Sequence, residues 1–371
     1  MFSFGKYNFR KYDVLLVLLT VAISILGIRF IGSAKEDLVM RQTQGLILGI
    51  AAMLLISVID YSFILRFYWL IYVFSITMLV LVKMFGDSGG GAARWFEIGS
   101  FRFQPSELVK ILLILFYAQF IMKHKESLNT FRMLLVCVLL ILPPFILIYE
   151  QPDLSTSIMI LIIFAVVMFV GGLSYKVVIG AIVVAVPSII IFLNMVLQPD
   201  QVILDEYQQK RILAWLQPEK YAATEAYQTM NAITAIGSGQ LTGKGLNNNV
   251  IASVKNGNFI SEAQTDFIFA VVGEELGFVG CCAVLGLLFL IVLECILIAR
   301  KSRDLAGSII AAGMAGLIGF QTFINIGVAT AILPNTGLPL PFLSYGLTSL
   351  VSLFIGIGFV LNVKMQTPKY L

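Results

Sequence analysis

Asp266 is a carboxylate placed where it could take a proton during a reaction. It lies in Thr265-Asp266-Phe267, between a polar segment and a long apolar run that ends at Ile298. A carboxylate at the lip of a partly apolar cleft is suited to act as a general base. An aspartate that opens a helix can equally serve as its N-cap, so both interpretations stay open on spacing alone. Counting back about 20 residues from Ile298 places Glu274 and Glu275 near the same membrane boundary.

A second polar group, Gln104-Pro105-Ser106-Glu107-Leu108-Val109-Lys110, begins another apolar run. Proline favours the first turn of a helix, so the run predicts a helix start at Pro105. Glu107 and Lys110 are three positions apart and share one face of that helix. They are either an acid favoured by the helix dipole beside a lysine that reaches the interface, or a polar patch that lines a cavity.

The remaining inventory excludes several mechanisms. The one histidine, His124, lies in the cationic stretch Lys123-His124-Lys125, which argues against a Ser-His-Asp hydrolase or a His-ligated zinc enzyme. The four cysteines lie in apolar runs without metal-ligand spacing, and we interpret them as packing residues. A net charge of +4 gives no argument for nucleic acid as a partner.

The elements that must position these side chains follow from composition. Of 371 residues, 59% are hydrophobic and only 12% are charged, and the mean hydropathy is +0.94. So few charges cannot coat a soluble fold of this size, so we predict an all-α polytopic membrane protein. Ten apolar runs are long enough to span a bilayer. They lie near Val14–Ile31, Gly45–Ile59, Phe67–Met84, Leu108–Met122, Met133–Tyr149, Ser155–Val170, Val177–Leu197, Phe267–Ile298, Gly307–Leu333 and Phe342–Val363.

Charge distribution predicts the orientation of these spans. With ten spans both termini share a side, and the segments on that side carry 13 lysines and arginines. The other side carries seven, with the long polar segment left out of the count. The positive-inside rule therefore places both termini in the cytoplasm and the remaining loops outside.

The outer loops then contain the long polar segment and the proline-rich segment. We treat residues 1–371 as one integral-membrane domain, with residues 198–261 forming a large extracytoplasmic loop between the seventh and eighth spans. Aromatic and charged residues mix in that loop, which predicts amphipathic helices on the membrane surface before a Gly/Asn-rich turn at 237–249. Three prolines in Pro334–Pro341 forbid regular helix there, and irregular backbone at membrane depth must line a cavity or be buried in protein. Four polar loops over one bundle imply a cavity open to the outer face.

In this order the motifs resemble the SEDS (shape, elongation, division and sporulation) family over most of the chain. The resemblance rests on Ala93-Arg94-Trp95-Phe96, Gln104-Pro105-Ser106-Glu107-Leu108-Val109-Lys110, Gln151-Pro152-Asp153-Leu154, Arg211-Ile212, Gly243-Lys244-Gly245, Thr265-Asp266-Phe267-Ile268-Phe269-Ala270, Gly273-Glu274-Glu275-Leu276-Gly277-Phe278, Asn325-Ile326-Gly327, Pro334-Asn335-Thr336-Gly337-Leu338-Pro339-Leu340-Pro341-Phe342 and Ser344-Tyr345-Gly346. Two positions depart from the family pattern: Leu347 follows Gly346 where a small residue is usual, and no aromatic residue precedes Gly243.

The resemblance implies a peptidoglycan glycosyltransferase that polymerises lipid II into glycan strands. The acceptor 4-hydroxyl would attack the anomeric carbon of the donor, expelling undecaprenyl pyrophosphate with inversion. The family's essential acid falls on Asp266, which makes it the predicted general base and the N-cap interpretation a minor one. We expect Arg94 and Arg211 to hold the pyrophosphate, because a guanidinium matches phosphate oxygens. Further substrate contacts are predicted at Trp95, Gln104, Ser106, Glu107, Lys110, Asp153, Lys244, Glu274 and Ser344.

The resemblance also implies partners. Family members act with a class B penicillin-binding protein, a transpeptidase, so we expect one here. A Mg²⁺ or Mn²⁺ ion bridging pyrophosphate to carboxylates is compatible with the residues, although the sequence shows no dedicated metal cage. The pattern is closer to the elongation branch, RodA, than to the division branch, FtsW, while a division or sporulation paralogue with the same chemistry stays open.

Two other functions compete with this interpretation. A flippase that moves lipid II across the bilayer would also need an outer cavity, broken helices and intramembrane charge. Against it, the polar groups cluster on one side and no inverted repeat is evident. A non-enzymatic scaffold would leave Asp266 and Arg94 without a role.

Overall fold

The computed structural model describes residues 9–86, 94–98, 101–198, 206–246, 259–261 and 263–367. The glycine-rich run 89–93 and residues 247–249 of the predicted Gly/Asn-rich turn lie outside them. The elements are α1 (Val14–Ala34), α2 (Val39–Val58), α3 (Tyr61–Leu65), α4 (Tyr68–Phe85), β1 (Phe96–Ile98), β2 (Phe101–Phe103), α5 (Pro105–Lys123), α6 (Phe131–Tyr149), α7 (Leu154–Val170), α8 (Tyr175–Val196), α9 (Glu206–Leu216), α10 (Tyr227–Ser238), α11 (Ile268–Arg300), α12 (Leu305–Ala329) and α13 (Leu347–Met365).

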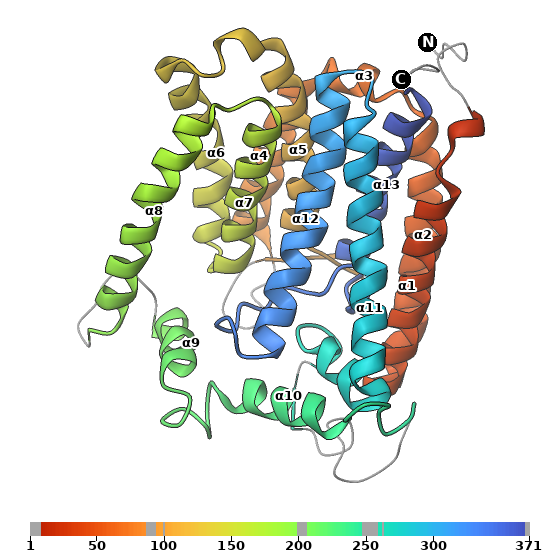
Figure 1. Cartoon of the computed structure of the whole chain (residues 1–371), viewed down its shortest axis with the longest axis vertical. Coiled ribbons are helices and arrows are strands. Elements are labelled where there is room, and N and C mark those ends of the chain that lie inside the picture. Colours follow the sequence, from red (N-terminus) through yellow and green to blue (C-terminus); the bar gives the residue numbers. More distant parts are fainter. Residues whose placement is uncertain are drawn as a thin grey trace.

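The prediction of a polytopic all-α membrane protein is confirmed. Among the described residues, nine helices of 18 residues or more are apolar enough to cross a bilayer, and α7 is a shorter apolar helix. These ten helices match the ten apolar runs of the sequence. The described residues before α1 and after α13 lie together at one end of the bundle, where Lys11 Nζ donates to Thr367 O at 3.2 Å (Figure 1). There Lys364 at the end of α13 forms an ion pair of 3.2 Å with Asp13, which caps α1.

The centre of the bundle is formed by α5, α12 and α13, whose side chains are the most buried among the spanning helices. Small residues allow close helix contacts, as expected for membrane bundles. On α12, Gly313 faces Ile114 of α5 and Gly316 faces Val166 of α7. By contrast, α8 has no buried side chain within its most apolar stretch and stands apart at the edge (Figure 1).

Helix α11 is broken near its start. Gly277 has φ 64° and ψ −159°, a conformation that is accessible almost only to glycine. A break leaves backbone groups without helical partners, and the loop after α10 supplies them. Lys244 N donates to Glu274 O at 2.9 Å, and Phe278 N donates to Gln240 O at 2.8 Å. The break therefore fixes the loop against the helix.

A methyl group at Gly277 should destabilise the protein. In Gly277→Ala the new Cβ would meet the loop backbone at Gly243 and Leu241, in a conformation that alanine rarely adopts. We expect a loss of about 1–3 kcal/mol in the free energy of unfolding. Thermal unfolding in detergent micelles measures it. Gly286→Ala is the matched control on the same helix, because nothing lies within 4 Å of its Cβ position. Equal melting temperatures for the two variants would contradict the claim that the position of Gly277 requires glycine.

One element departs from the helical pattern. β1 and β2 form an antiparallel pair in which Phe96 lies opposite Phe103 and Glu97 lies opposite Arg102. The sequence signal is the alternation of apolar and polar residues on both sides of Gly99-Ser100, which is typical of a short hairpin. The pair leads directly into α5.

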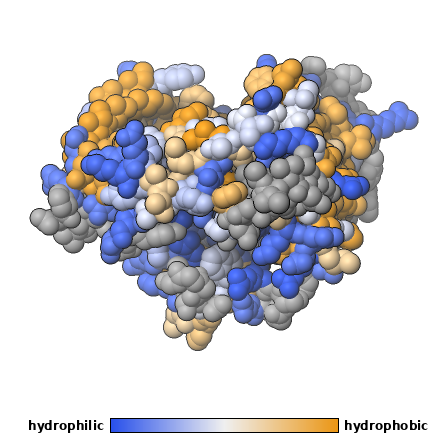
Figure 2. Space-filling view, turned by 90° about the horizontal axis from the view of Figure 1, so that it is seen from below, coloured by the Kyte–Doolittle hydropathy of each residue, from blue (hydrophilic) through white to orange (hydrophobic). Residues whose placement is uncertain are grey.

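The segment between α8 and α11 carries two short helices. α9 and α10 lie at the end of the molecule opposite the start of α1 and the end of α13, with α10 beside the lower end of α11 (Figure 1). α9 is held to the bundle by Ile212, which packs on Val196 of α8, and by Trp215 Nε1, which donates to Ala331 O at 3.2 Å. Seen from this end, hydrophilic residues gather over the middle and apolar residues lie on the flanks (Figure 2).

Candidate active site

A cavity of about 830 Å³ lies toward the end of the bundle that carries α9 and α10. Its described lining includes five basic side chains and four carboxyl groups, so it suits a charged, polar ligand. The lining residues are Lys35, Leu38, Arg41, Arg94, Trp95, Glu97, Arg102, Gln104, Glu107, Asp153, Thr156, Arg211, Gln264, Thr265, Asp266, Thr336, Gly337, Leu338, Pro339, Tyr345, Gly346, Leu347, Thr348 and Ser349.

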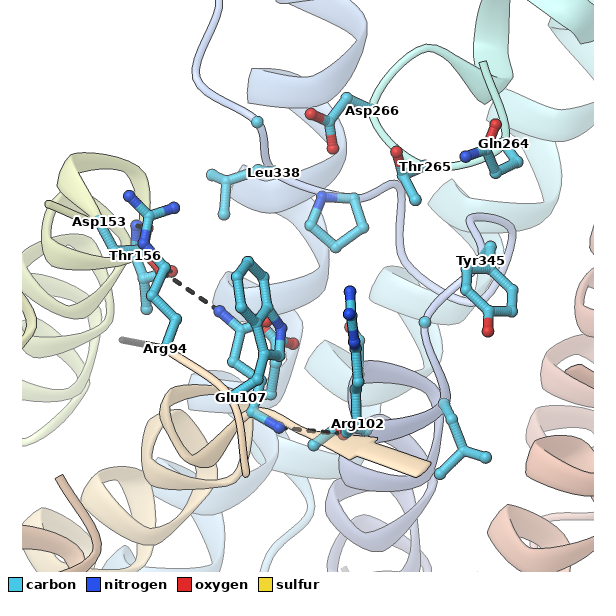
Figure 3. A pocket seen from close by; sticks show the side chains of 18 of the residues that line it. Arg94, Arg102, Glu107, Asp153, Thr156, Gln264, Thr265, Asp266, Leu338 and Tyr345 are labelled. Carbon is cyan, nitrogen blue, oxygen red and sulfur yellow. Dashed lines mark hydrogen bonds between the residues drawn. The ribbon is translucent and has the colours of Figure 1, made fainter. Parts of the chain in front are cut away.

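Segments far apart in the sequence bring the predicted residues into this cavity. Those that line it are Arg94, Trp95, Gln104, Glu107, Asp153, Arg211 and Asp266. Asp266 and Thr265 enter from the segment before α11, while Arg94, Glu107 and Asp153 lie across the cavity from them (Figure 3). The proline-rich segment after α12 passes between, with Leu338 beside Asp266 (Figure 3).

Asp266 is half-buried and precedes α11. The N-cap position of α11 is Phe267, so Asp266 lies one residue before the cap. A Cβ built on Gly337 would lie 3.3 Å from Asp266 Oδ2 and 3.7 Å from Arg211 Nη1. The carboxylate and the guanidinium therefore both border Gly337, whose φ of 77° places it in the region that favours glycine. Arg211 Nη1 also donates to Asn335 O at 3.4 Å.

Arg94 supports the cavity wall on the opposite side. Its Nε donates to Gln151 O at 2.7 Å, and its Nη2 donates to Pro152 O. These bonds hold the turn before α7, in which Pro152 has a positive φ of 21°. Two guanidinium nitrogens of Arg94, which is predicted to bind pyrophosphate, thus donate to backbone carbonyls. Arg94 therefore has a structural role in addition to its place in the cavity lining.

Asp153 caps α7 from the cavity wall. Its Oδ1 accepts from Thr156 N at 3.0 Å, and its Oδ2 accepts from Thr156 Oγ1 at 2.9 Å. Gln104 Nε2 donates to the same Oδ2 at 3.3 Å, which links the starts of α5 and α7. The carboxylate therefore fixes two helix ends beside each other.

Replacing Asp153 should reveal the cap as a loss of stability. Asp153→Ala removes the acceptor for Thr156 N, and a lost N-cap costs about 1 kcal/mol in the free energy of unfolding. Asp153→Asn keeps an acceptor oxygen, so its free energy of unfolding should lie within about 0.3 kcal/mol of the parental value. Thermal melts of the three proteins in the same detergent decide the matter. A parental melting temperature for Asp153→Ala would show that the cap contributes nothing.

The predicted pair on α5 is buried inside the bundle. Lys110 Nζ lies 2.8 Å from Glu107 Oε1, with 1% and 5% of these residues exposed. Lys110 does not reach a membrane interface, because its ammonium group also donates to Gln321 Oε1 at 3.1 Å. Gln321 Nε2 in turn donates to Pro339 O at 2.9 Å. Glu107 lines the cavity, whereas Lys110 acts behind it through Gln321.

Four other predicted residues, like Lys110, lie outside the cavity lining. Ser106 is buried in the first turn of α5, at 3% exposure. Lys244 and Glu274 form an ion pair of 2.9 Å beside the break in α11, where the loop binds the helix. Ser344 Oγ donates to Thr265 O at 2.6 Å and accepts from Leu340 N at 2.7 Å. The structure brings none of these side chains to the cavity, since each is taken up by packing or by a contact within the protein.

Comparison with known proteins identifies the family. A family model described as "Cell cycle protein", covering FtsW, RodA and SpoVE, matches residues 10–369. The chain belongs to the FtsW/RodA/SpoVE family. This family corresponds to the SEDS resemblance seen in the motifs, and the chain is an integral membrane protein.

Relatives within the FtsW/RodA/SpoVE family carry enzymatic names. The chain is 38% identical to the peptidoglycan glycosyltransferase MrdB of Escherichia coli K12, over 79% of this chain and 76% of the relative. It is 31% identical to the probable peptidoglycan glycosyltransferase FtsW of Geobacter metallireducens, over 98% of each.

Solved structures of the family share the fold. One, described as "Structural coordination of polymerization and crosslinking by a peptidoglycan synthase complex", superposes with a TM-score of 0.79 at 32% identity and covers 95% of this chain and 97% of its own. Another, the Rod shape determining protein RodA of Thermus thermophilus, gives a TM-score of 0.69 at 30% identity and covers 95% of this chain and 96% of its own.

Within the family fold, three basic residues join the cavity that the motifs did not indicate. Lys35 lies in the short connection between α1 and α2, Arg41 lies in the first turn of α2, and Arg102 comes from β2, where its Nε donates to Glu97 Oε1 at 2.9 Å. In the sequence, Lys35 and Arg41 had served only to define orientation. Their position beside a very short connection between two spans was the available signal.

No metal cage is found in the part of the chain that the structure describes, since no three His, Cys, Asp or Glu side chains cluster there. A Mg²⁺ or Mn²⁺ ion that joins pyrophosphate to a carboxylate would need fewer protein ligands. That ion stays a prediction.

Proposed function

We propose that this protein polymerises lipid II into glycan strands, with Asp266 as the general base. The observation that carries the proposal is the position of Asp266: its carboxylate lines a polar cavity, precedes the helix cap, and borders Gly337 together with the Arg211 guanidinium. The names of the family relatives support the same reaction class.

The proposed step is an inverting displacement. Asp266 accepts the proton of the acceptor 4-hydroxyl as its oxygen bonds to the anomeric carbon of the donor MurNAc. The bond from that carbon to the pyrophosphate oxygen breaks on the opposite face, and undecaprenyl pyrophosphate leaves with the electron pair. One carboxylate is sufficient, because the pyrophosphate leaves as a stabilised anion that needs no general acid, and no covalent enzyme intermediate forms.

Cations in the cavity stabilise the leaving group. Preorganised positive charge near a developing anion is among the largest contributions to catalysis. Arg211 and the other basic side chains of the lining give the cavity this character, with Arg94 on the wall across from Asp266 (Figure 3). Glu107, Gln104, Trp95 and Asp153 are proposed to contact the sugar and peptide parts of the substrate.

The orientation follows from the charge count. We place both termini in the cytoplasm and the cavity on the outer side, as part of a single membrane domain whose segment 198–261 is extracytoplasmic. The start of α1 and the end of α13 lie at one end of the bundle and α9 and α10 at the other, which fits this arrangement (Figure 1). A lipid-linked substrate would then enter from the outer leaflet.

We further propose a role in cell elongation beside a class B penicillin-binding protein. Identity to MrdB, at 38%, is higher than to the FtsW relative, at 31%. A similar solved chain comes from a complex described as coordinating polymerization and crosslinking, which supports a transpeptidase partner.

A reconstitution experiment separates polymerase from flippase. The purified protein, with its partner, is placed in vesicles that carry fluorescent lipid II in one leaflet. We expect long glycan strands on a gel when the cavity side meets the substrate. Lipid II that changes leaflet without forming strands would favour the transporter instead.

A further inference from the structure

The segment that carries Asp266 is held by its backbone. The three successive carbonyls of Gln264, Thr265 and Asp266 each accept a hydrogen bond from a different donor. Tyr345 N lies 2.8 Å from Gln264 O, Ser344 Oγ lies 2.6 Å from Thr265 O, and Asn325 Nδ2 lies 2.8 Å from Asp266 O. This segment precedes α11, so the bonds of that helix do not fix it. Its position depends on these contacts from elsewhere in the chain.

Asn325 makes the contact nearest to the carboxylate. It lies on α12 and is 1% exposed. The same amide nitrogen also donates to Leu338 O at 2.7 Å. Asp266 and Leu338 both line the cavity, on the two segments that meet there. One rigid, buried amide therefore holds the base-carrying segment and the proline-rich segment together.

Ser344 repeats the arrangement one residue earlier. Its hydroxyl donates to Thr265 O and accepts from Leu340 N, so it also joins the two segments. Behind it, Gln42 of α2 donates to Ser344 O at 3.1 Å and accepts from Gly346 N at 3.2 Å. The hydrogen bonds of Asn325 and Ser344 are therefore supported by two spanning helices, α12 and α2.

We propose that Asn325 is a positioning residue for Asp266, with Ser344 as its companion. The inference rests on the proposed function of Asp266 as the base. By holding the Asp266 and Leu338 carbonyls on one amide, Asn325 sets the distance between the base and the cavity wall at Leu338. A displacement of a reacting group by about 1 Å can cost 10²-fold in rate.

The test measures lipid II polymerisation by the purified protein with its partner. Asn325→Ala should lower kcat about 10²-fold and change KM less than about threefold, because substrate contacts are kept while the base moves. The acid limb of its kcat–pH profile should also shift, since the surroundings of the carboxylate change. Thr322→Val is the control on α12, because the Thr322 hydroxyl bonds only to Ile318 O of its own helix. It should retain the parental kcat and profile.

Ser344→Ala guards against a folding defect in Asn325→Ala, because it removes a single oxygen atom. It should lower kcat about tenfold and shift the same limb. Suppose that Asp266→Asn is inactive. A parental kcat and a parental kcat–pH profile in Asn325→Ala would then overturn the inference. If Asn325→Ala does not fold, the same result in Ser344→Ala would overturn it. Should Asp266→Asn polymerise at the parental rate, the proposed function fails first and the inference falls with it.

Discussion

Replacing Asp266 with asparagine should lower the rate of glycan polymerisation by about 10²- to 10⁴-fold. The amide has nearly the same shape as the carboxylate but cannot accept the proton of the acceptor hydroxyl. The backbone contacts of Asp266 do not involve its side chain, so the segment should keep its place. Initial rates measured over a range of fluorescent lipid II concentrations, up to saturation, give the change in kcat.

Two observations guard this expectation. The variant must keep the parental melting temperature and partner binding. Asp37→Asn is the matched control, because Asp37 is an exposed acid next to the cavity residue Leu38 but does not itself line the cavity. Parental activity in Asp266→Asn, or an equal loss in Asp37→Asn, would contradict the role of Asp266 as the base.

Removing the Arg211 guanidinium should cost about 10²- to 10³-fold in kcat/KM. In Arg211→Gln, a cation that borders Gly337 together with Asp266 disappears from the cavity in which we propose that the pyrophosphate leaves. Arg211→Lys restores charge without the planar fork, so we expect an intermediate rate. Arg94 is less informative for this purpose, because its loss would also release the turn at Gln151 and Pro152.

Lys210→Gln gives the matched control for Arg211. Lys210 lies on the same helix, α9, and pairs with exposed Glu206 at 2.6 Å, outside the cavity lining. It should polymerise lipid II at the parental rate. Losses of similar size in Lys210→Gln and Arg211→Gln would show that general surface charge, and not the guanidinium beside Asp266, controls the reaction.

The sequence predicted the spans well because bilayer thickness sets a length that composition reveals. Ten runs of suitable length became ten apolar helices, and the prolines of 334–341 kept that segment irregular. These features depend on local properties of the chain. The same holds for Pro105, which begins α5 as expected.

The sequence could not predict features that depend on contacts between distant segments. The break at Gly277 is stable because residues 240–245 supply backbone partners, and neither segment shows this alone. Lys244 and Glu274 pair with each other at that break and stay out of the cavity for the same reason. Lys35 lines the same cavity as Tyr345, although the two residues are far apart in the sequence.

The predicted site residues also fall into two groups, those that line the cavity and those that do not. Asp266, Arg211 and Glu107 were found through motifs and do line the cavity. Lys110 and Ser344 belong to the same motifs but lie outside the cavity lining, where Lys110 donates to Gln321 and Ser344 donates to Thr265 O. A motif shows that a residue matters to the family, whereas only the fold shows whether its side chain reaches the cavity.

The most direct test counts two products of the purified protein acting on lipid II. Glycosidic bonds and released undecaprenyl pyrophosphate are quantified in the same reaction, and the anomeric configuration of each new bond is determined by NMR. The account predicts one undecaprenyl pyrophosphate for each bond and inverted configuration throughout. Intact lipid II with neither product, or bonds formed with retention, would contradict it.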